Sequence, residues 1–168
     1  MIQFSGAKYR FAVGFAAAVF AIILIIWFGF IQTKGNHLDP SGWISSVRTM
    51  PLSDDVTLMV IDFSILNDSD QQMVVSSIDP WITTGGGNNI HGSLYSAVDM
   101  PKTFKFYPKL GPQLNEPLVV RGTIDGHKTV SKMVGIEFDV PPRVVESRRS
   151  MTLRVEDITG PAVEMNGQ

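Results

Sequence analysis

Apolar residues follow two different patterns along the chain, and the first is an unbroken run. Residues 11–31 read FAVGFAAAVFAIILIIWFGFI and contain no charged side chain. A helix of this length spans roughly 31 Å, which matches the hydrocarbon core of a bilayer. A buried core helix would show a polar stripe, and a signal peptide would have a shorter apolar run that ends in small residues. The pattern therefore predicts an uncleaved membrane anchor that includes Phe11, Trp27 and Ile31.

Basic residues flank this run unequally. Lys8 and Arg10 precede it. Lys34 is the basic residue close behind it, and Asp39 follows soon after. By the positive-inside rule, the N-terminus is expected in the cytoplasm. The expected location is therefore the cell (inner) membrane, with a single span and a periplasmic or extracellular C-terminal domain.

The second pattern begins near residue 56 and consists of short runs separated by Gly, Pro, Asn and Asp, which is typical of β-strands. The run 56–66 is apolar on one face and on most of the other, so we expect a central strand. Asp125-Gly126 lies between two strand-like runs and predicts a tight hairpin. About seven short strands in about 105 residues predict an all-β fold, an immunoglobulin-like antiparallel β-sandwich. Together with the apolar run, the expected architecture is this sandwich preceded by one transmembrane α-helix. A small barrel is the rival architecture.

These patterns divide the chain into consecutive segments. The expected segments are a cytoplasmic tail at 1–10, a transmembrane anchor at 11–31, a linker at 32–55, a β-sandwich domain at 56–160 and a tail at 161–168. The linker is expected because turn-forming residues are frequent there. Further strands are expected at 72–78, 93–100, 103–107, 117–124, 128–140 and 151–157.

Composition mainly excludes classes of function. Of 168 residues, 44% are hydrophobic and 18% are charged, which is a globular balance. The net charge is −2, so no nucleic-acid partner is expected. The chain has no cysteine, which excludes disulfides, thiolate metal sites and cysteine nucleophiles.

Three acidic residues, Asp62, Asp68 and Asp70, lie close together in the stretch VIDFSILNDSDQQMVV. A calcium loop that starts at Asp68 would need glycine where Met73 stands. We therefore expect a turn that begins at Asn67, and no metal or cofactor. Strand alternation places Asp62 on a face that should be partly buried, and the sequence does not indicate what it pairs with. Asn67 also starts an Asn-x-Ser glycosylation pattern.

Two regions are candidates for contact with a partner. The run TTGGGNNIHG lacks the lysine and hydroxyl residue of a phosphate-binding loop, so we expect an exposed recognition loop there, with a second contact loop at 108–116. A cluster of arginines is expected either to protect a strand edge or to contact an acidic partner. The expected loop residues are Gly85, Gly86, Gly87, Asn88, Asn89 and His91, and the expected basic patch is Arg143, Arg148, Arg149 and Arg154.

No pattern in the chain indicates catalysis. A G-x-S-x-G nucleophile elbow is missing from the sequence, and the three histidines lie far apart without ligand spacing. The methionines are scattered rather than paired, which favours core packing over copper binding. We therefore do not expect an enzyme.

Three segments in order behind the apolar run, FSILNDSDQQMVV, KMVGIEFDVP and MTLRVED, resemble those of late-embryogenesis-abundant type 2 (water-stress, WHy) domains and related bacterial membrane-anchored immunoglobulin-like domains. The resemblance covers residues 56–158. The glycine run and the region of Asp125-Gly126 depart from the family pattern. The resemblance implies a non-catalytic β-sandwich with a binding, protective or accessory role, and it supplies no catalytic residue. The matching residues are Asn67, Ser69, Asp70, Gly135, Phe138, Val140 and Pro141.

The expected function is thus a single-pass, membrane-anchored extracytoplasmic β-sandwich that acts as a non-catalytic binding or accessory module of the cell envelope. The alternatives are a structural subunit of a larger membrane complex and a metal-binding envelope protein. The expected partners are the lipid bilayer and either another protein or a second copy of the chain.

Overall fold

The computed structural model describes residues 13, 15, 18–27 and 40–167. The chain forms two units, Met1–His37 and Leu38–Gln168, which are described separately.

The described residues of the first unit, Trp27 among them, are helical. Within the described part of the chain, no helix has the length and apolarity needed to cross a bilayer. The predicted tail 1–10, the anchor residues Phe11 and Ile31, and residues 32–39 of the predicted linker lie outside the described residues.

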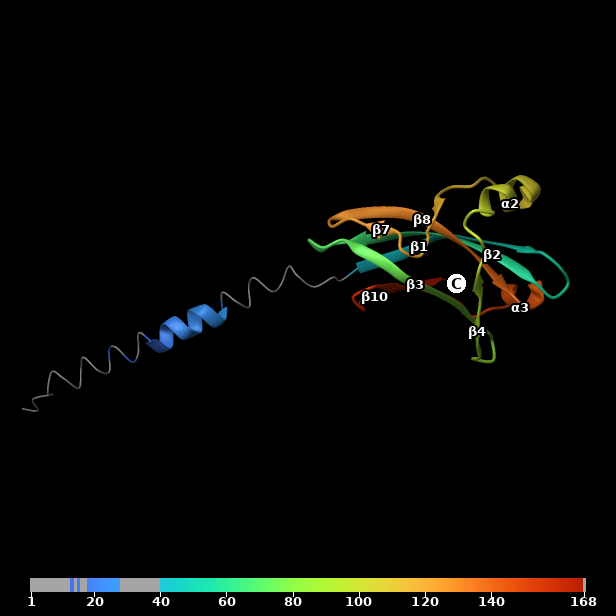
Figure 1. The fold of residues 1–168 in the computed structure, drawn as a ribbon. Helices are drawn as coiled ribbons and strands as arrows, with labels where there is room; N and C mark the ends of the chain where they lie inside the picture. Colours follow the sequence, from blue (N-terminus) through green and yellow to red (C-terminus); the bar gives the residue numbers. More distant parts are fainter. Residues whose placement is uncertain (1–12, 14, 16–17, 28–39, 168) are drawn as a thin grey trace, which may run out of the picture. The chain divides into compact units, whose positions relative to one another are not determined.

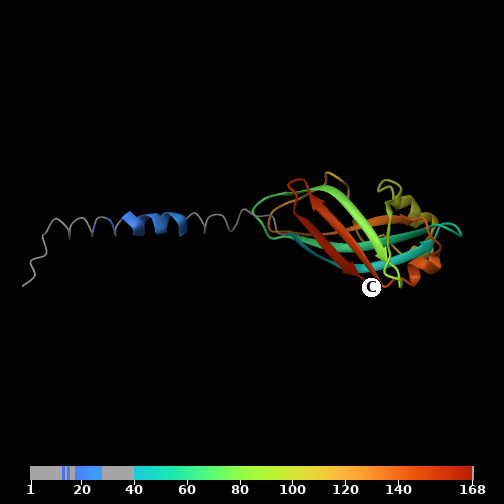
Figure 2. The same cartoon turned by 90° about the horizontal axis from the view of Figure 1, so that it is seen from below.

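The second unit is a β-sandwich, as the strand pattern predicted, and its two sheets have five strands each (Figures 1 and 2). The strand pairs are antiparallel except for the parallel pair β6–β8. The first sheet has the order β1 (Pro40–Pro51), β2 (Thr57–Asn67), β8 (Lys128–Phe138) and β5 (Ser93–Leu94), with β6 (Glu116–Pro117) also beside β8. The second has the order β10 (Ala162–Gly167), β9 (Ser150–Asp157), β3 (Met73–Thr83) and β4 (Asn89–His91), with β7 (Thr123–Ile124) also beside β3.

Strand β2 is central, as its pattern predicted, and it carries apolar residues on both faces for two separate reasons. Met59, Ile61 and Phe63 point into the main core between the sheets. Leu58 and Val60 belong to a second apolar cluster on the outer side of the same sheet. That cluster is closed by the helix α2 (Met100–Phe106) and the short 3₁₀ helix η1 (Pro108–Leu110).

Helix α2 replaces strands that the sequence predicted at 93–100 and 103–107. Only Ser93–Leu94 form a strand in this region. Pro101 occupies the first turn of α2, where a missing backbone N–H costs no hydrogen bond. A third helix, α3 (Pro142–Glu146), connects the two sheets and also has proline in its first turn.

Two strands lie in segments that the sequence placed outside the domain. Residues 40–51 of the predicted linker form β1, and residues 162–167 of the predicted tail form β10. Each lies at the edge of its sheet and buries few side chains. Backbone pairing with a neighbouring strand therefore creates them, rather than an apolar alternation that could be read locally.

The prediction of a hairpin at Asp125-Gly126 is wrong. Strand β7 pairs with β3 in the second sheet, whereas β8 pairs with β2 in the first, so the chain crosses between the sheets at this turn. Gly126 is required there by close approach, because a Cβ at this position would lie 2.5 Å from the carbonyl oxygen of Ser69. The predicted strand 117–124 is likewise broken by a turn, in which Gly122 N donates to Val119 O at 2.9 Å.

Candidate functional site

Asp62 is a buried carboxylate on the outer face of β2, and only 1% of the residue is exposed. Its Oδ2 accepts a hydrogen bond from Arg48 Nη2 at 2.6 Å, and its Oδ1 accepts one from Asn115 Nδ2 at 2.9 Å. Arg48 Nη1 also donates to the carbonyl oxygens of Leu110 and Pro112, at 2.7 and 2.8 Å. The carboxylate and the guanidinium together fix the segment after η1 onto the first sheet.

The guanidinium of Arg48 also lies 5.2 Å from the ring centroid of Phe104, within the range of a cation–π contact. Both side-chain oxygens of Asp62 therefore serve a structural role, since each accepts a hydrogen bond that holds neighbouring segments in place. No sequence signal could have identified the pair, because Arg48 falls in the predicted linker and Asn115 in a loop. Leu110, Pro112 and Asn115 of the predicted contact loop 108–116 are hydrogen-bonded to this pair, so the loop does not project freely.

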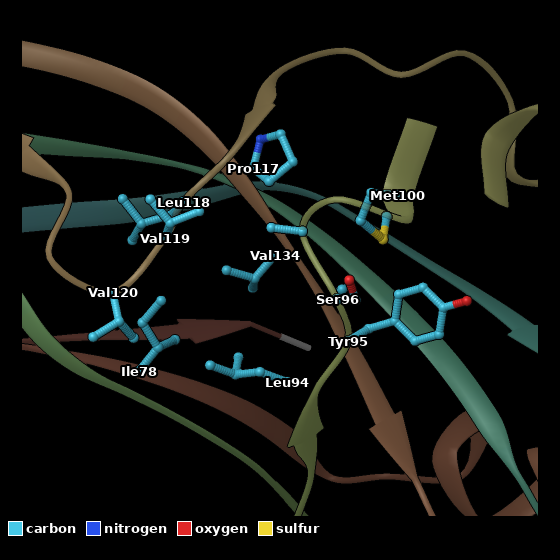
Figure 3. Close-up of a pocket in the computed structure, with 12 residues that line it drawn as sticks. Ile78, Leu94, Tyr95, Ser96, Met100, Pro117, Leu118, Val119, Val120 and Val134 are labelled. Carbon is cyan, nitrogen blue, oxygen red and sulfur yellow. The ribbon is translucent and has the colours of Figure 1, made fainter. Parts of the chain in front are cut away.

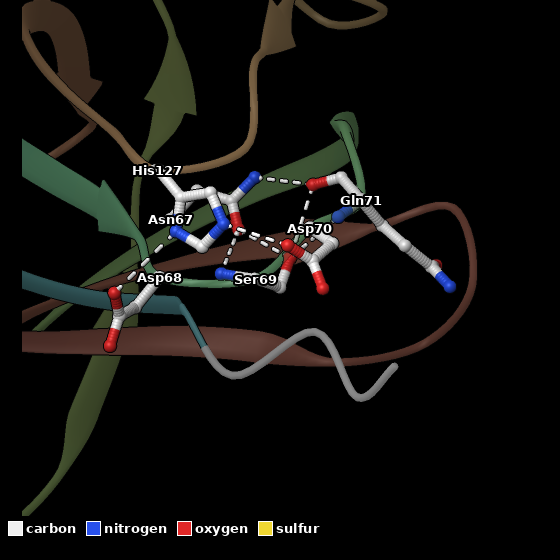
Figure 4. A network of polar contacts seen from close by, with 6 residues as sticks. All are labelled: Asn67, Asp68, Ser69, Asp70, Gln71 and His127. Carbon is white, nitrogen blue, oxygen red and sulfur yellow. Dashed lines mark hydrogen bonds and ion pairs between the residues drawn. The ribbon is translucent and has the colours of Figure 1, made fainter. Parts of the chain in front are cut away.

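The predicted turn at Asn67 is present and is stabilised by its own side chains (Figure 4). Asn67 is fully buried, and its Nδ2 donates to Gln71 O at 2.7 Å and to Ile124 O at 3.1 Å. Its Oδ1 accepts hydrogen bonds from Ser69 N at 3.2 Å and from Ser69 Oγ at 2.7 Å. The nitrogen that a glycan would modify is thus engaged and inaccessible in the folded domain.

The acidic residues of this turn contact a histidine from the turn between β7 and β8. His127 Nε2 lies 2.8 Å from Asp70 Oδ1, and His127 Nδ1 lies 3.9 Å from Asp68 Oδ1. All three side chains are largely exposed. Across the described ranges, no group of three or more His, Cys, Asp or Glu side chains is arranged to hold a metal ion. The pairs join two neighbouring turns at the end of the sandwich where β1 begins.

Asp157 is a second buried carboxylate, with 3% of the residue exposed. Its Oδ1 accepts from Val74 N at 2.5 Å, and its Oδ2 accepts from Thr159 N at 2.8 Å and from Thr159 Oγ1. Burial alone would raise the pKa of this carboxyl. The hydrogen bonds from Thr159 and from the backbone outweigh burial, so the pKa of Asp157 lies below its ordinary value.

The predicted recognition loop forms the exposed tip of the β3–β4 hairpin. Thr84 N donates to Asn88 O and Gly87 N donates to Thr84 O, both at 2.9 Å. Gly87 has a φ of +84°, which favours glycine. A Cβ on Gly85 would meet no atom within 4 Å, so this part of the tip faces open space. The loop is a hydrogen-bonded turn.

The two other loop residues lie on β4 itself. Asn89 Oδ1 accepts a hydrogen bond from Thr83 Oγ1 at 2.9 Å. His91 Nδ1 lies 3.0 Å from Asp79 Oδ1, and its ring centroid lies 5.7 Å from that of Trp81. These contacts fix both side chains to the outer face of the second sheet, beside the tip.

Three of the four arginines of the predicted basic patch lie around α3, next to the hairpin. Arg143 and Arg149 are exposed, and Arg148 is half-buried. Arg148 Nη1 donates to Val145 O at 2.9 Å, and burial lowers the pKa of its guanidinium. Arg149 N donates to Thr83 O at 2.7 Å. These three arginines and the predicted recognition loop, far apart in sequence, therefore meet at one end of the sandwich.

Arg154 is not brought together with the other three. It lies midway along β9 on the outer face of the second sheet. Its guanidinium forms ion pairs with Glu156 at 2.7 Å and with Glu164 at 3.2 Å. Its charge is thus balanced by side chains of β9 and β10.

An apolar cavity of about 250 Å³, which no sequence pattern indicated, opens between the edges of the two sheets (Figure 3). Its lining comes from β3, β8, the segment between β5 and α2, and the segment between β6 and β7. Because these segments are distant in sequence, no local period could have revealed the cavity.

Comparison with known proteins identifies no family. No family model matches the chain, and no curated protein matches it. The archaellum periplasmic stator protein FlaG from Sulfolobus acidocaldarius superposes with a TM-score of 0.37 at 9% identity, covering 77% of this chain and 100% of that chain. The archaellum periplasmic stator complex of FlaF and FlaG from the same organism gives a TM-score of 0.31 at 9% identity, over 75% of this chain and 87% of that chain.

An uncharacterised β-sandwich protein from Clostridium difficile 630 gives a TM-score of 0.32 at 13% identity, covering 79% of this chain and 82% of that chain. Similarities at this level carry no inference about function. The resemblance to WHy domains is supported as far as the β-sandwich, and beyond that it stays a prediction.

Proposed function

We propose that the chain is a membrane-anchored, extracytoplasmic binding module without catalytic activity, which contacts a protein partner through the end of the sandwich opposite Pro40. The hydrogen bond from Arg149 N to Thr83 O carries the proposal, because it joins the two candidate contact regions. The apolar run 11–31 supports the anchor, and the flanking charges support an extracytoplasmic domain.

The strand register supports one shared contact surface at that end. Strand β1 runs from Pro40 to Pro51, and Pro51 is opposite Thr57 at the far end of the first sheet. In the second sheet, Thr83 is opposite Ser150. Figures 1 and 2 place α3 and the β3–β4 hairpin at the end away from the start of β1. A partner could therefore contact the glycine tip and the arginines around α3 together.

The structural use of the buried carboxylates supports a binding role over an enzymatic one. Asp62 accepts hydrogen bonds from Arg48 and Asn115, and Asp157 accepts from Thr159 and Val74. Both side chains hold loops against the sheets. The exposed charge around α3 is instead available for electrostatic contact with a partner, which mainly affects the rate and specificity of association.

Two measurements on the full chain test the proposal. A reporter fused after Gln168 should be active only when exported. Purification in mild detergent should recover a stable companion that is lost from the double variant Arg143→Glu/Arg149→Glu. Lys128→Glu is the control. It reverses one positive charge at the end of the sandwich where β1 begins, away from α3, and it should keep the companion.

Three outcomes contradict the proposal: a reporter active in the cytoplasm, equal recovery from the arginine double variant and wild type, or equal loss from the lysine control. A companion that survives all charge reversals would favour a structural subunit of a larger complex.

A further inference from the structure

We propose that the apolar cavity is a binding site for an uncharged aliphatic chain of about eight carbons, estimated from a cavity of about 250 Å³ and roughly 30 Å³ per water-sized group. This site is separate from the contact surface at the end of the sandwich. Its occupant differs in kind, since it is a small apolar group rather than a protein.

The cavity follows from gaps in the pairing of two strands. The outer edge of β8 is covered by β6 at Lys132 and Met133 and by β5 at Ile136 and Glu137. Val134, between these pairs, lines the cavity. The corresponding edge of β3 is covered by β7 at one end and by β4 at the other, and the cavity lies alongside the stretch between them. The opening is therefore part of the sheet topology.

The lining selects an apolar occupant. Ile78, Leu118 and Val134 are nearly fully buried around it, with exposures of 8%, 7% and 3%. At the opening, Val119 and Val120 remain 49% and 47% exposed. No lining residue is charged. Filling such a space with aliphatic groups removes apolar surface from water on both sides, which is the main source of affinity at apolar sites.

Polar side chains lie at one end only (Figure 3). Tyr95 and Ser96 border the cavity there, on the side opposite Val120. The Tyr95 hydroxyl accepts a hydrogen bond from Thr103 at 3.3 Å and points away from the apolar lining, whereas Ser96 lies closer to that lining (Figure 3). An occupant can therefore place a hydroxyl at this end, beside Ser96. The cavity lining offers no cationic side chain, and a carboxylate would lose its hydration there, so an alcohol should bind better than the corresponding carboxylate.

The test uses the full chain in lipid nanodiscs and a photoreactive probe, an eight-carbon alcohol that carries a diazirine. After irradiation and proteolysis, mass spectrometry should find the label on the peptides that contain Leu118 and Val134. Unlabelled 1-alkanols should compete about fourfold better per added methylene. This gain should stop near eight carbons, because longer chains exceed the cavity. Octanoate should compete roughly tenfold less well than 1-octanol.

Variants separate the cavity from general partitioning. Val134→Phe fills the cavity and should abolish labelling, provided that its thermal unfolding stays cooperative. Leu94→Ala and Val120→Ala change exposed lining positions without opening the core, and each should weaken competition a few-fold. Val98→Ala is the matched control, because Val98 is 80% exposed and does not line the cavity, and it should leave labelling unchanged.

Several outcomes overturn the proposal: labelling outside the cavity only, labelling that excess 1-octanol does not reduce, or a competition series that keeps rising beyond the cavity length. Equal labelling of folded Val134→Phe and wild type also overturns it. A second arm places the diazirine on the acyl chain of a nanodisc phospholipid without free alcohol. Labelling of the cavity in that arm assigns the site to a lipid tail, and labelling only in the first arm assigns it to a free molecule.

Discussion

Removing the Asp62 carboxylate should destabilise the domain more than removing its whole ion pair. In Asp62→Ala, the Arg48 guanidinium keeps its charge with only 18% of its side chain exposed, and it loses a partner at 2.6 Å. Breaking one side of a buried pair typically costs about 3–5 kcal/mol. Arg48 keeps the carbonyl oxygens of Leu110 and Pro112, so we expect the lower end, about 3 kcal/mol.

The double variant Arg48→Met/Asp62→Leu should behave differently. It removes both charges together with the cost of keeping them out of water, and it places apolar side chains next to the second cluster. Its stability should lie within about 2 kcal/mol of wild type, a loss that arises because the carbonyl oxygens of Leu110 and Pro112 no longer have Arg48 as a donor. A double-mutant cycle built from the single variants Arg48→Met and Asp62→Leu and from this double variant should then give a coupling energy of about 2 kcal/mol or more.

Urea unfolding of the unit Leu38–Gln168, followed by far-ultraviolet circular dichroism, measures both effects. With a slope of about 1.5 kcal/mol per molar urea, Asp62→Ala should lower the midpoint by roughly 2 M. Hydrogen exchange should also rise in the segment 110–115. A midpoint change below about 0.5 M, or a double variant as unstable as the single one, would refute the reasoning.

Three further predictions concern the turns and the second buried carboxylate. Asn67→Ala should cost about 2 kcal/mol in the same titration, and mass spectrometry of wild type from a glycosylating host should find Asn67 unmodified; a glycan there would contradict its burial. Gly126→Ala should lower the melting temperature by roughly 6 °C or more, because the new Cβ meets Ser69 O; an unchanged melt would show that the turns separate easily. The pKa of Asp157 is lowered in the folded state, so its stabilisation is present above about pH 4 and is lost as the pH falls through the folded pKa. Melts from pH 7 down to about pH 2.5 should therefore decline less steeply for Asp157→Asn than for wild type, and parallel curves would count against this role.

Sequence patterns predicted the parts of the fold whose side chains alternate or form long apolar runs. The strands β2, β8 and β9 were expected within a few residues of their observed bounds, and the turn at Asn67 was expected from its turn-forming residues. These elements carry their own signal because burial on one or both faces imposes a period on the sequence.

The errors arise where distant contacts decide the local structure. Strand β1 contains Gly42, Ser45 and Ser46, which read as a linker, and pairing with β2 makes it a strand. The Asp125-Gly126 turn has hairpin chemistry, yet Ile124 pairs with Met73 across the molecule. Neither partner can be inferred from a local period.

The candidate site shows the same limit. The glycine tip and the arginines were found by residue type alone. Their meeting depends on the register of Thr83 with Ser150, which places Arg149 beside the hairpin. The cavity between the sheets depends on which stretches of β3 and β8 lack a neighbouring strand, so it could not be anticipated.

The position of β2 between β1 and β8 has a consequence for synthesis. β1 and β2 are adjacent in sequence and can pair as soon as both have emerged, whereas β8 ends at Phe138. Translation proceeds at about 5–20 residues per second, so the edge of β2 that pairs with β8 stays unpaired for roughly 4–14 s. During that interval an apolar strand has an open edge, which is a template for association between nascent chains. A chaperone that binds extended apolar segments would act most usefully in this window, before the Lys128–Phe138 strand is complete.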